Sequence, residues 1–160
     1  MLKYMVEKNK KRRYALITIL IMLFIFIQSA LPGDLSGRES GMIAAFLAQI
    51  FGKGLAEFSL FIRKGAHFTE YALLGISMFL YVREWLKERR ETESMIRYAA
   101  VWLAGTFYAA TDEFHQLFVP GRSGQVSDVL IDSAGVLAGI LLTAVILRTG
   151  KRRSGEAGAS

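Results

Sequence analysis

Three separate motifs carry side chains that could bind a metal ion or transfer a proton. The first contains His67 and Glu70, the second contains Asp112 and His115, and the third contributes Asp132. A charged group within an apolar segment is costly and must be paired, hydrated or used, so these five are our candidates for catalytic roles. The same motifs carry further polar side chains that we assign to substrate binding: Arg63, Lys64, Tyr71, Glu113, Gln116, Arg122 and Asp128.

The spacing within the motifs predicts that these side chains share helix faces. Residues three or four apart lie on one face of a helix, and the histidine and acid of the first two motifs are three apart. In the third motif, Asp128 and Asp132 align with Gly135 and Gly139. Small residues four apart let a neighbouring helix pack closely. We therefore expect the carboxylates to point into a helix bundle, with Glu113 displaced to the edge of its face.

The motifs lie in long apolar segments, as in a membrane protein. Four segments approach or exceed the length needed to cross a bilayer: 14–31, 65–82, 96–118 and 126–147. A signal peptide is the alternative for the first segment, but Gln28 fits a cleavage site poorly and further spans follow. We predict an all-α bundle of four transmembrane helices.

The segment 42–62 has a different pattern. Apolar residues recur at helical spacing up to Phe51, a break follows at 52–54, and the pattern resumes at Leu55. A fifth crossing would place Lys53 and Glu57 in hydrocarbon. We therefore expect one or two amphipathic helices lying at the outer membrane interface.

The distribution of Lys and Arg predicts the orientation. The formal net charge is +6, and the cations cluster before the first span, between the second and third, and after the fourth. By the positive-inside rule these segments, and both termini, are cytoplasmic. The expected organisation is a basic cytoplasmic N-terminus (1–13), one four-helix domain (14–147) and a disordered basic tail (148–160). Without interleaved basic and aromatic residues, nucleic-acid binding is not expected, and the absence of cysteine excludes thiolate chemistry.

This topology places all three motifs near the outer surface of the cytoplasmic membrane. Pro120 and Gly121 predict a turn between the last two spans, which makes those helices antiparallel neighbours and holds Arg122 above the acids.

The motifs and their order resemble those of the VanZ-like family of small bacterial membrane proteins. The resemblance covers roughly 63–139 and rests on Arg63-Lys64-x-x-His67-Phe-x-Glu70-Tyr71, on Asp112-Glu113-x-His115-Gln116 followed by Pro120-Gly121-Arg122, and on Asp128-x-x-x-Asp132. It implies a link to reduced susceptibility to teicoplanin, a lipid-bearing glycopeptide that acts on cell-wall precursors outside the membrane. It implies no particular reaction.

Three functions fit the polar residues. In the first, a metal-dependent hydrolase or transferase at the outer leaflet uses a divalent ion, with His67, Glu70, Asp112 and His115 as candidate ligands. A metal-free variant of this hypothesis uses a histidine as general base. In the second, the residues bind a phospholipid, a cell-wall precursor or a lipoglycopeptide without converting it, and the arginines contact its anionic group. In the third, they form a buried ion-pair network with a purely structural role. The sequence leaves open whether the protein is an enzyme, and its oligomeric state.

Overall fold

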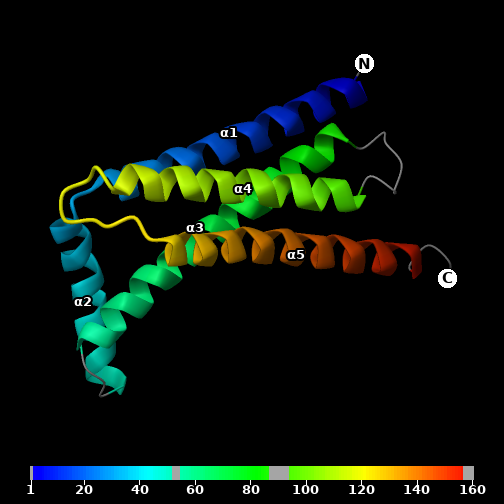
Figure 1. The fold of residues 1–160 in the computed structure, drawn as a ribbon. Coiled ribbons are helices and arrows are strands. Elements are labelled where there is room, and N and C mark those ends of the chain that lie inside the picture. Colours follow the sequence, from blue (N-terminus) through cyan, green and yellow to red (C-terminus); the bar gives the residue numbers. More distant parts are fainter. Residues whose placement is uncertain (1, 52–54, 87–93, 157–160) are drawn as a thin grey trace.

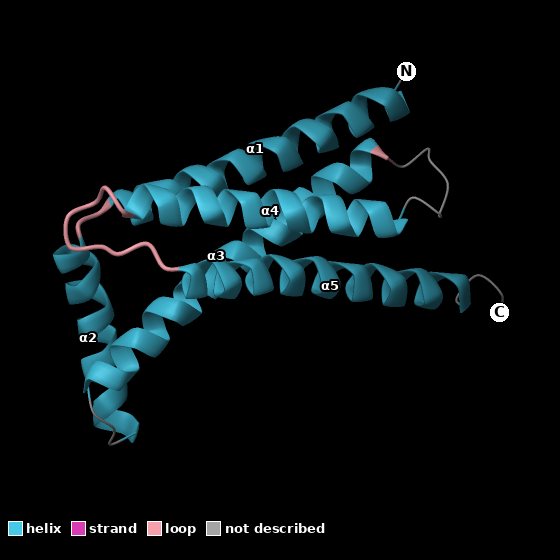
Figure 2. Ribbon diagram, viewed as in Figure 1, coloured by secondary structure: helices cyan, strands magenta, loops and turns pink. Residues whose placement is uncertain are grey.

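The structure is an α-helical bundle with one helix set across its end. A computed structural model describes residues 2–51, 55–86 and 94–156, and these residues contain helices and loops but no strand (Figure 2). The helices are α1 (Leu2–Ala30), α2 (Gly33–Phe51), α3 (Leu55–Trp85), α4 (Ser94–Gln116) and α5 (Val126–Glu156). The expected all-α fold is confirmed.

The long helices place the two ends of the chain at the same end of the bundle. Helices α1, α4 and α5 run alongside one another, and α3 crosses them obliquely (Figure 1). Its contacts with α5 are the most extensive, and it also packs against α1, α2 and α4. The end of α1, the α4–α5 loop and the start of α5 meet at the opposite end, from which α2 extends steeply away (Figure 1).

Glycine allows α3 and α5 to approach closely. A Cβ atom built on Gly139 would lie 2.9 Å from the carbonyl carbon of Ala72 and closer still to its oxygen, and one on Gly135 would collide with the carbonyl oxygen of Phe68. From the other helix, a Cβ on Gly75 would meet the backbone of Val136. The close approach predicted from the four-residue glycine spacing is therefore confirmed.

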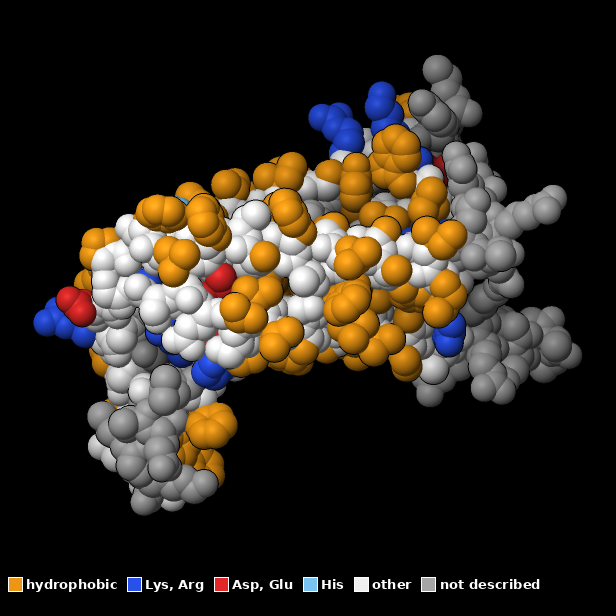
Figure 3. Space-filling view, in the orientation of Figure 1, with side chains coloured by type: hydrophobic (Ala, Val, Ile, Leu, Met, Phe, Trp, Pro, Cys, Tyr) orange, Lys and Arg blue, Asp and Glu red, His pale blue; other side chains and the backbone are white. Residues whose placement is uncertain are grey.

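The interior and the surface differ from those of a water-soluble bundle. A core shared by α1, α3, α4 and α5 consists of Ile25, Tyr71, Leu74, Phe79, Val101, Ala109, Val136 and Ile140. Many large apolar side chains nevertheless remain exposed, and they spread along the flank of the bundle (Figure 3). Within the described residues, the segments Met5–Ala30 and Val126–Gly150 are long and apolar enough to cross a membrane. The four-span topology stays a prediction.

The structure corrects two expected boundaries. Helix α2 begins at Gly33 rather than at 42, directly after Pro32 and with Asp34 in its first turn, both of which favour a helix start. Residues 55–62 belong to α3 and not to an interfacial helix, because their apolar period continues without a breaker. The predicted break at 52–54 lies outside the described residues.

Helix α5 continues beyond the expected span to Glu156. The disorder expected for 148–160 stays a prediction.

Candidate functional site

The three polar motifs meet inside the bundle, as their spacing predicted. His67 of α3, Glu113 of α4 and Asp132 of α5 each offer a ligand atom, and these atoms all lie within 4.8 Å of one another. The His67 Nδ1 atom is 3.6 Å from the Asp132 Oδ2 atom. Asp132 is fully buried and Glu113 is only 4% exposed. We call these three residues the buried triad.

Glu113 has a more central place than sequence analysis gave it. The backbone nitrogen of Gln125 donates to Glu113 Oε2 at 2.9 Å, and Gln116 Nε2 donates to Oε1 at 3.3 Å. The loop passes directly over Glu113 at Gly124, where a Cβ would collide with the Glu113 carbonyl oxygen. Glu113 is therefore buried by a loop, which helix periodicity alone cannot reveal.

Other predicted residues surround the buried triad. Asp112 is 3% exposed and accepts a long hydrogen bond from Gln116 Nε2, at 3.5 Å. The Tyr71 side chain is fully buried within electrostatic range of Asp112 and Asp132. The ring centroid of Tyr108 lies 6.2 Å from that of Tyr71. The Tyr108 hydroxyl donates a hydrogen bond to the Met22 carbonyl of α1.

His115 and Glu70 do not join the buried triad. The His115 ring packs against Phe26 of α1, with 4.8 Å between ring centroids. Glu70 lies between the polar pocket described below and an apolar groove between α1 and α3. Of the four candidate ligands named from sequence, His67 belongs to the described group whose ligand atoms lie within 4.8 Å of one another, and the roles of Glu70, Asp112 and His115 stay predictions.

Two predicted substrate-binding residues pair with each other. Lys64 Nζ lies 2.6 Å from Asp128 Oδ1, and the lysine side chain is 40% exposed while that of the aspartate is 12% exposed. This ion pair links α3 to the first turn of α5. Both charges are neutralised within the protein.

Arg122 holds the end of α1. Its Nε atom donates to the Leu31 carbonyl at 2.9 Å, and its Nη2 atom donates to the Gln28 carbonyl at 2.7 Å. The Leu31 carbonyl lies just beyond the helix, and the Gln28 carbonyl in the last turn of α1 also accepts a 3.4 Å bond from the Leu31 backbone nitrogen. The guanidinium therefore ties the loop to the end of α1 through one carbonyl inside the helix and one outside it. Burial and the nearby charge of Arg63 lower the pKa of Arg122. Arginine nevertheless stays protonated in proteins, so this end of the bundle retains a cation.

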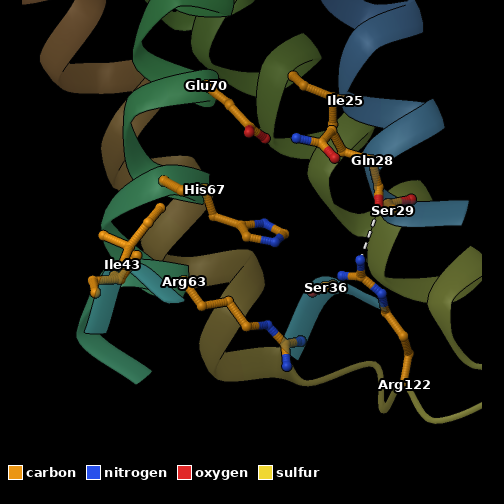
Figure 4. Close-up of a pocket in the computed structure, with 11 residues that line it drawn as sticks. Ile25, Gln28, Ser29, Ser36, Ile43, Arg63, His67, Glu70 and Arg122 are labelled. Atoms are coloured by element: carbon orange, nitrogen blue, oxygen red, sulfur yellow. Dashed lines mark hydrogen bonds between the residues drawn. The ribbon is translucent and has the colours of Figure 1, made fainter. Parts of the chain in front are cut away.

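A polar pocket opens beside these residues, at the end of the bundle. It has a volume of about 180 Å³ and lies between α1, α2, α3 and the α4–α5 loop. Arg63 and His67 extend into it from α3, and Arg122 faces them from the loop (Figure 4). The full lining comprises Ile25, Gln28, Ser29, Ser36, Ile43, Ile62, Arg63, Ala66, His67, Glu70 and Arg122.

Several buried polar atoms near the pocket lack hydrogen-bond partners among the described residues. They are His67 Nδ1, both carboxylate oxygens of Asp132, Asp112 Oδ1 and the Tyr71 hydroxyl. Buried polar atoms in proteins are normally hydrogen-bonded, so a group of such exceptions marks a place where a ligand can bind.

The fold and the site together define a small all-helical protein with a buried acidic centre and a basic pocket beside it. The family model described as VanZ/LLP1 matches residues 14–147, and the chain therefore belongs to the VanZ family. Membership indicates a membrane protein linked to glycopeptide resistance. No curated protein and no solved structure is significantly similar to the chain.

Proposed function

We propose that the protein crosses the cytoplasmic membrane four times, through α1, α3, α4 and α5, with both termini in the cytoplasm. Even α4, the shortest of these with 23 residues, extends about 35 Å at 1.5 Å per residue, against about 30 Å for the hydrocarbon core. The start of α1 and the end of α3 lie at one end of the bundle, where Lys11 Nζ is 5.3 Å from the centre of the Trp85 ring. Exposed basic residues of α1 lie at that end, namely Lys8, Lys10, Arg12 and Arg13, and they support a cytoplasmic assignment for it, although Figure 3 shows basic side chains at the opposite end as well.

In this topology the pocket faces the outside and α2 lies at the outer interface. Helix α2 lies at a steep angle to the long axis of the bundle (Figure 1), and Met42, Phe46 and Ile50 are exposed along it. An amphipathic helix at the interface buries such side chains among the acyl chains of the lipids. Helix α2 also contributes Ser36 and Ile43 to the pocket, so the pocket opening lies at the depth of the headgroups.

The pocket binds the anionic headgroup of a lipid-linked or lipid-bearing molecule. The observation that carries this proposal is the convergence of Arg63 and Arg122 on one small pocket, close enough for the charge of one to affect the other. Two guanidinium groups together suit a phosphate or carboxylate. A volume of about 180 Å³ is below the 300–1,000 Å³ typical of small-molecule pockets, so it suits a headgroup rather than a whole lipid.

An apolar groove beside the pocket suits the hydrocarbon part of the same ligand. The groove lies between α1 and α3 and is lined by Ile17, Leu20, Ile21, Phe24, Glu70 and Leu73. Glu70 lines both the groove and the polar pocket, so the two sites are adjacent. An amphiphile can therefore place its charged group between the arginines and its chain along α1.

By holding such an amphiphile at the outer surface, the protein lowers the susceptibility of the cell to teicoplanin. The ligand chemistry is shared by phospholipids, lipid-linked cell-wall precursors and the lipoglycopeptide itself.

The test is the teicoplanin susceptibility of cells that make single arginine variants. Arg63→Gln should remove the protection, because it removes one of the two charges that face the anion, while the amount of protein in the membrane stays the same. Arg148→Gln is the matched control, since Arg148 is exposed at the opposite end of the bundle. Full protection by Arg63→Gln at wild-type abundance would contradict the proposed anion pocket.

A direct binding measurement completes this test. Purified protein in nanodiscs is analysed by native mass spectrometry for retained phosphatidylglycerol, with phosphatidylcholine as the neutral comparison. Preferential retention of the anionic lipid that is lost in Arg63→Gln identifies a phospholipid headgroup. No preference, together with protection that depends on Arg63, assigns the pocket to a precursor or to the lipoglycopeptide.

A further inference from the structure

The centre of the bundle contains three buried carboxyl groups. Asp112, Glu113 and Asp132 are 3%, 4% and 0% exposed. Lys64 pairs with Asp128, and the charge of Arg122 acts on Asp112 and Glu113 only from a distance, since its hydrogen bonds go to carbonyls near the end of α1. Among the described residues, neither Lys nor Arg forms an ion pair with the three buried acids. Within the described part of the chain, the basic side chain that pairs with Asp132 is a histidine at 3.6 Å. Buried carboxylates without a counter-charge cost several kcal/mol each, so this arrangement favours a bound cation.

We infer that the buried triad of His67, Glu113 and Asp132 is a binding site for a divalent transition-metal ion such as Zn²⁺. Ligands of a tetrahedral zinc at about 2.0 Å lie about 3.3 Å from one another. The His67–Asp132 pair is already near that separation at 3.6 Å, and all three ligand atoms lie within 4.8 Å. Small side-chain rotations are enough to close the remaining gap.

The free atoms of the buried triad point to a ligand independently of the cluster itself. Asp132 is fully buried, and neither of its carboxylate oxygens has a hydrogen-bond partner among the described residues. The Nδ1 atom of His67 is unpartnered in the same region. These are the lone-pair donors that a metal ion needs. With a neutral imidazole, the two carboxylates balance a charge of +2.

Neighbouring groups hold the third ligand in place. The backbone nitrogen of Gln125 and the side-chain amide of Gln116 each donate to a different oxygen of Glu113. Metal-binding side chains in proteins are usually oriented by such outer hydrogen bonds. Each oxygen keeps a lone pair for the ion.

The mixture of ligands selects the class of metal. Imidazole together with carboxylates suits Zn²⁺, Mn²⁺ or Fe²⁺, whereas Ca²⁺ prefers oxygen ligands alone and a larger number of them. Three protein ligands leave a coordination position open. Because His67 also lines the headgroup pocket, the ion would lie one side chain away from a ligand bound there. The metal site does not depend on the proposed headgroup binding.

The test is a titration of the purified, chelator-stripped protein in detergent with Zn²⁺ alone, read out as metal bound per chain after equilibrium dialysis. The expected stoichiometry is one ion per chain, with no binding of Ca²⁺ at the same concentration. His67→Ala should weaken zinc binding at least tenfold, since even the loss of an outer hydrogen bond to a metal ligand costs about 10- to 100-fold. Asp132→Asn and Glu113→Gln should each do the same.

The chain offers matched controls for these variants. It has two histidines, and His115→Ala should leave zinc binding unchanged because that ring packs against α1. Asp34→Asn repeats the Asp→Asn change at an exposed position of α2. Circular dichroism and the elution volume in size-exclusion chromatography establish that each variant is folded. If His67→Ala or Asp132→Asn does not fold, Glu113→Gln provides the test in its place.

Specific results would overturn the inference. They are the absence of saturable Zn²⁺ binding by the wild-type protein, an equal loss in His115→Ala, or unchanged affinity in folded His67→Ala. Because no lipid is present in the titration, each of these results leaves the headgroup proposal to be judged by its own experiment.

Discussion

Replacing Gly139 with alanine should separate α3 from α5 and disturb the site. The new Cβ would lie 2.9 Å from the Ala72 carbonyl carbon, about 0.5 Å inside the 3.4 Å at which ordinary Cβ contacts begin. The neighbouring atoms belong to the backbone and cannot rotate away, so the helices must move apart. Overpacking of this kind costs about 1–3 kcal/mol. The distance between His67 and Asp132 should lengthen, because these residues lie on the two displaced helices.

The assay is reversible unfolding in mixed detergent and sodium dodecyl sulfate micelles, followed by circular dichroism. Gly65→Ala is the matched control: it makes the same change in α3, where nothing in the described structure lies within 4 Å of the new atom. It should be neutral or stabilising by up to about 1 kcal/mol, because alanine favours the helix over glycine. Equal free energies of unfolding for the two variants would refute the assigned role of the glycine contacts.

Three further substitutions test separate parts of the structure. Thr106→Val removes the 2.8 Å hydrogen bond to Ser133 between α4 and α5 and should lower the free energy of unfolding by about 0.6 kcal/mol, measured in the same micelles; no loss would show that the bond is not stabilising. Arg122→Lys cannot make both bonds to the end of α1, so limited proteolysis should cleave near 31–33 faster than in the wild type. Ser123→Cys should react with an impermeant thiol reagent added outside the cell and Thr149→Cys should not; the reverse pattern would invert the topology.

The features predicted from sequence are those that local periodicity and turn chemistry determine. The three-residue spacing brings His67 into the bundle, and the four-residue spacing does the same for Asp132. Val119 to Arg122 form the turn expected from Pro120 and Gly121, with φ +74° at the glycine and a 3.1 Å hydrogen bond that closes it.

The features that sequence analysis could not predict concern contacts between distant parts of the chain. Helix periodicity places Glu113 at the edge of its face, whereas in the structure the loop at Gln125 covers it and its ligand atom lies within 4.8 Å of those of His67 and Asp132. Arg122 was expected above the acids, and its charge does act on Asp112, Glu113 and Glu70. Its hydrogen bonds to α1, however, could not be predicted from the loop sequence. Similarly, the packing of α1 against His115 depends on tertiary structure that no pattern within α4 contains.

The bonds from the α4–α5 loop to α1 constrain the order in which the protein is assembled. Arg122 reaches carbonyls 91 and 94 positions earlier in the chain, and Gly33 donates to the Pro120 carbonyl at 3.0 Å. While the ribosome is still producing α4, the α4–α5 loop does not yet exist. The end of α1, Gly33 and Glu113 therefore lack the contacts that this loop provides. Domains form from the N-terminus onward during synthesis. The buried triad is therefore the last part of this protein to be completed, and a nascent chain that stalls before α5 does not contain it.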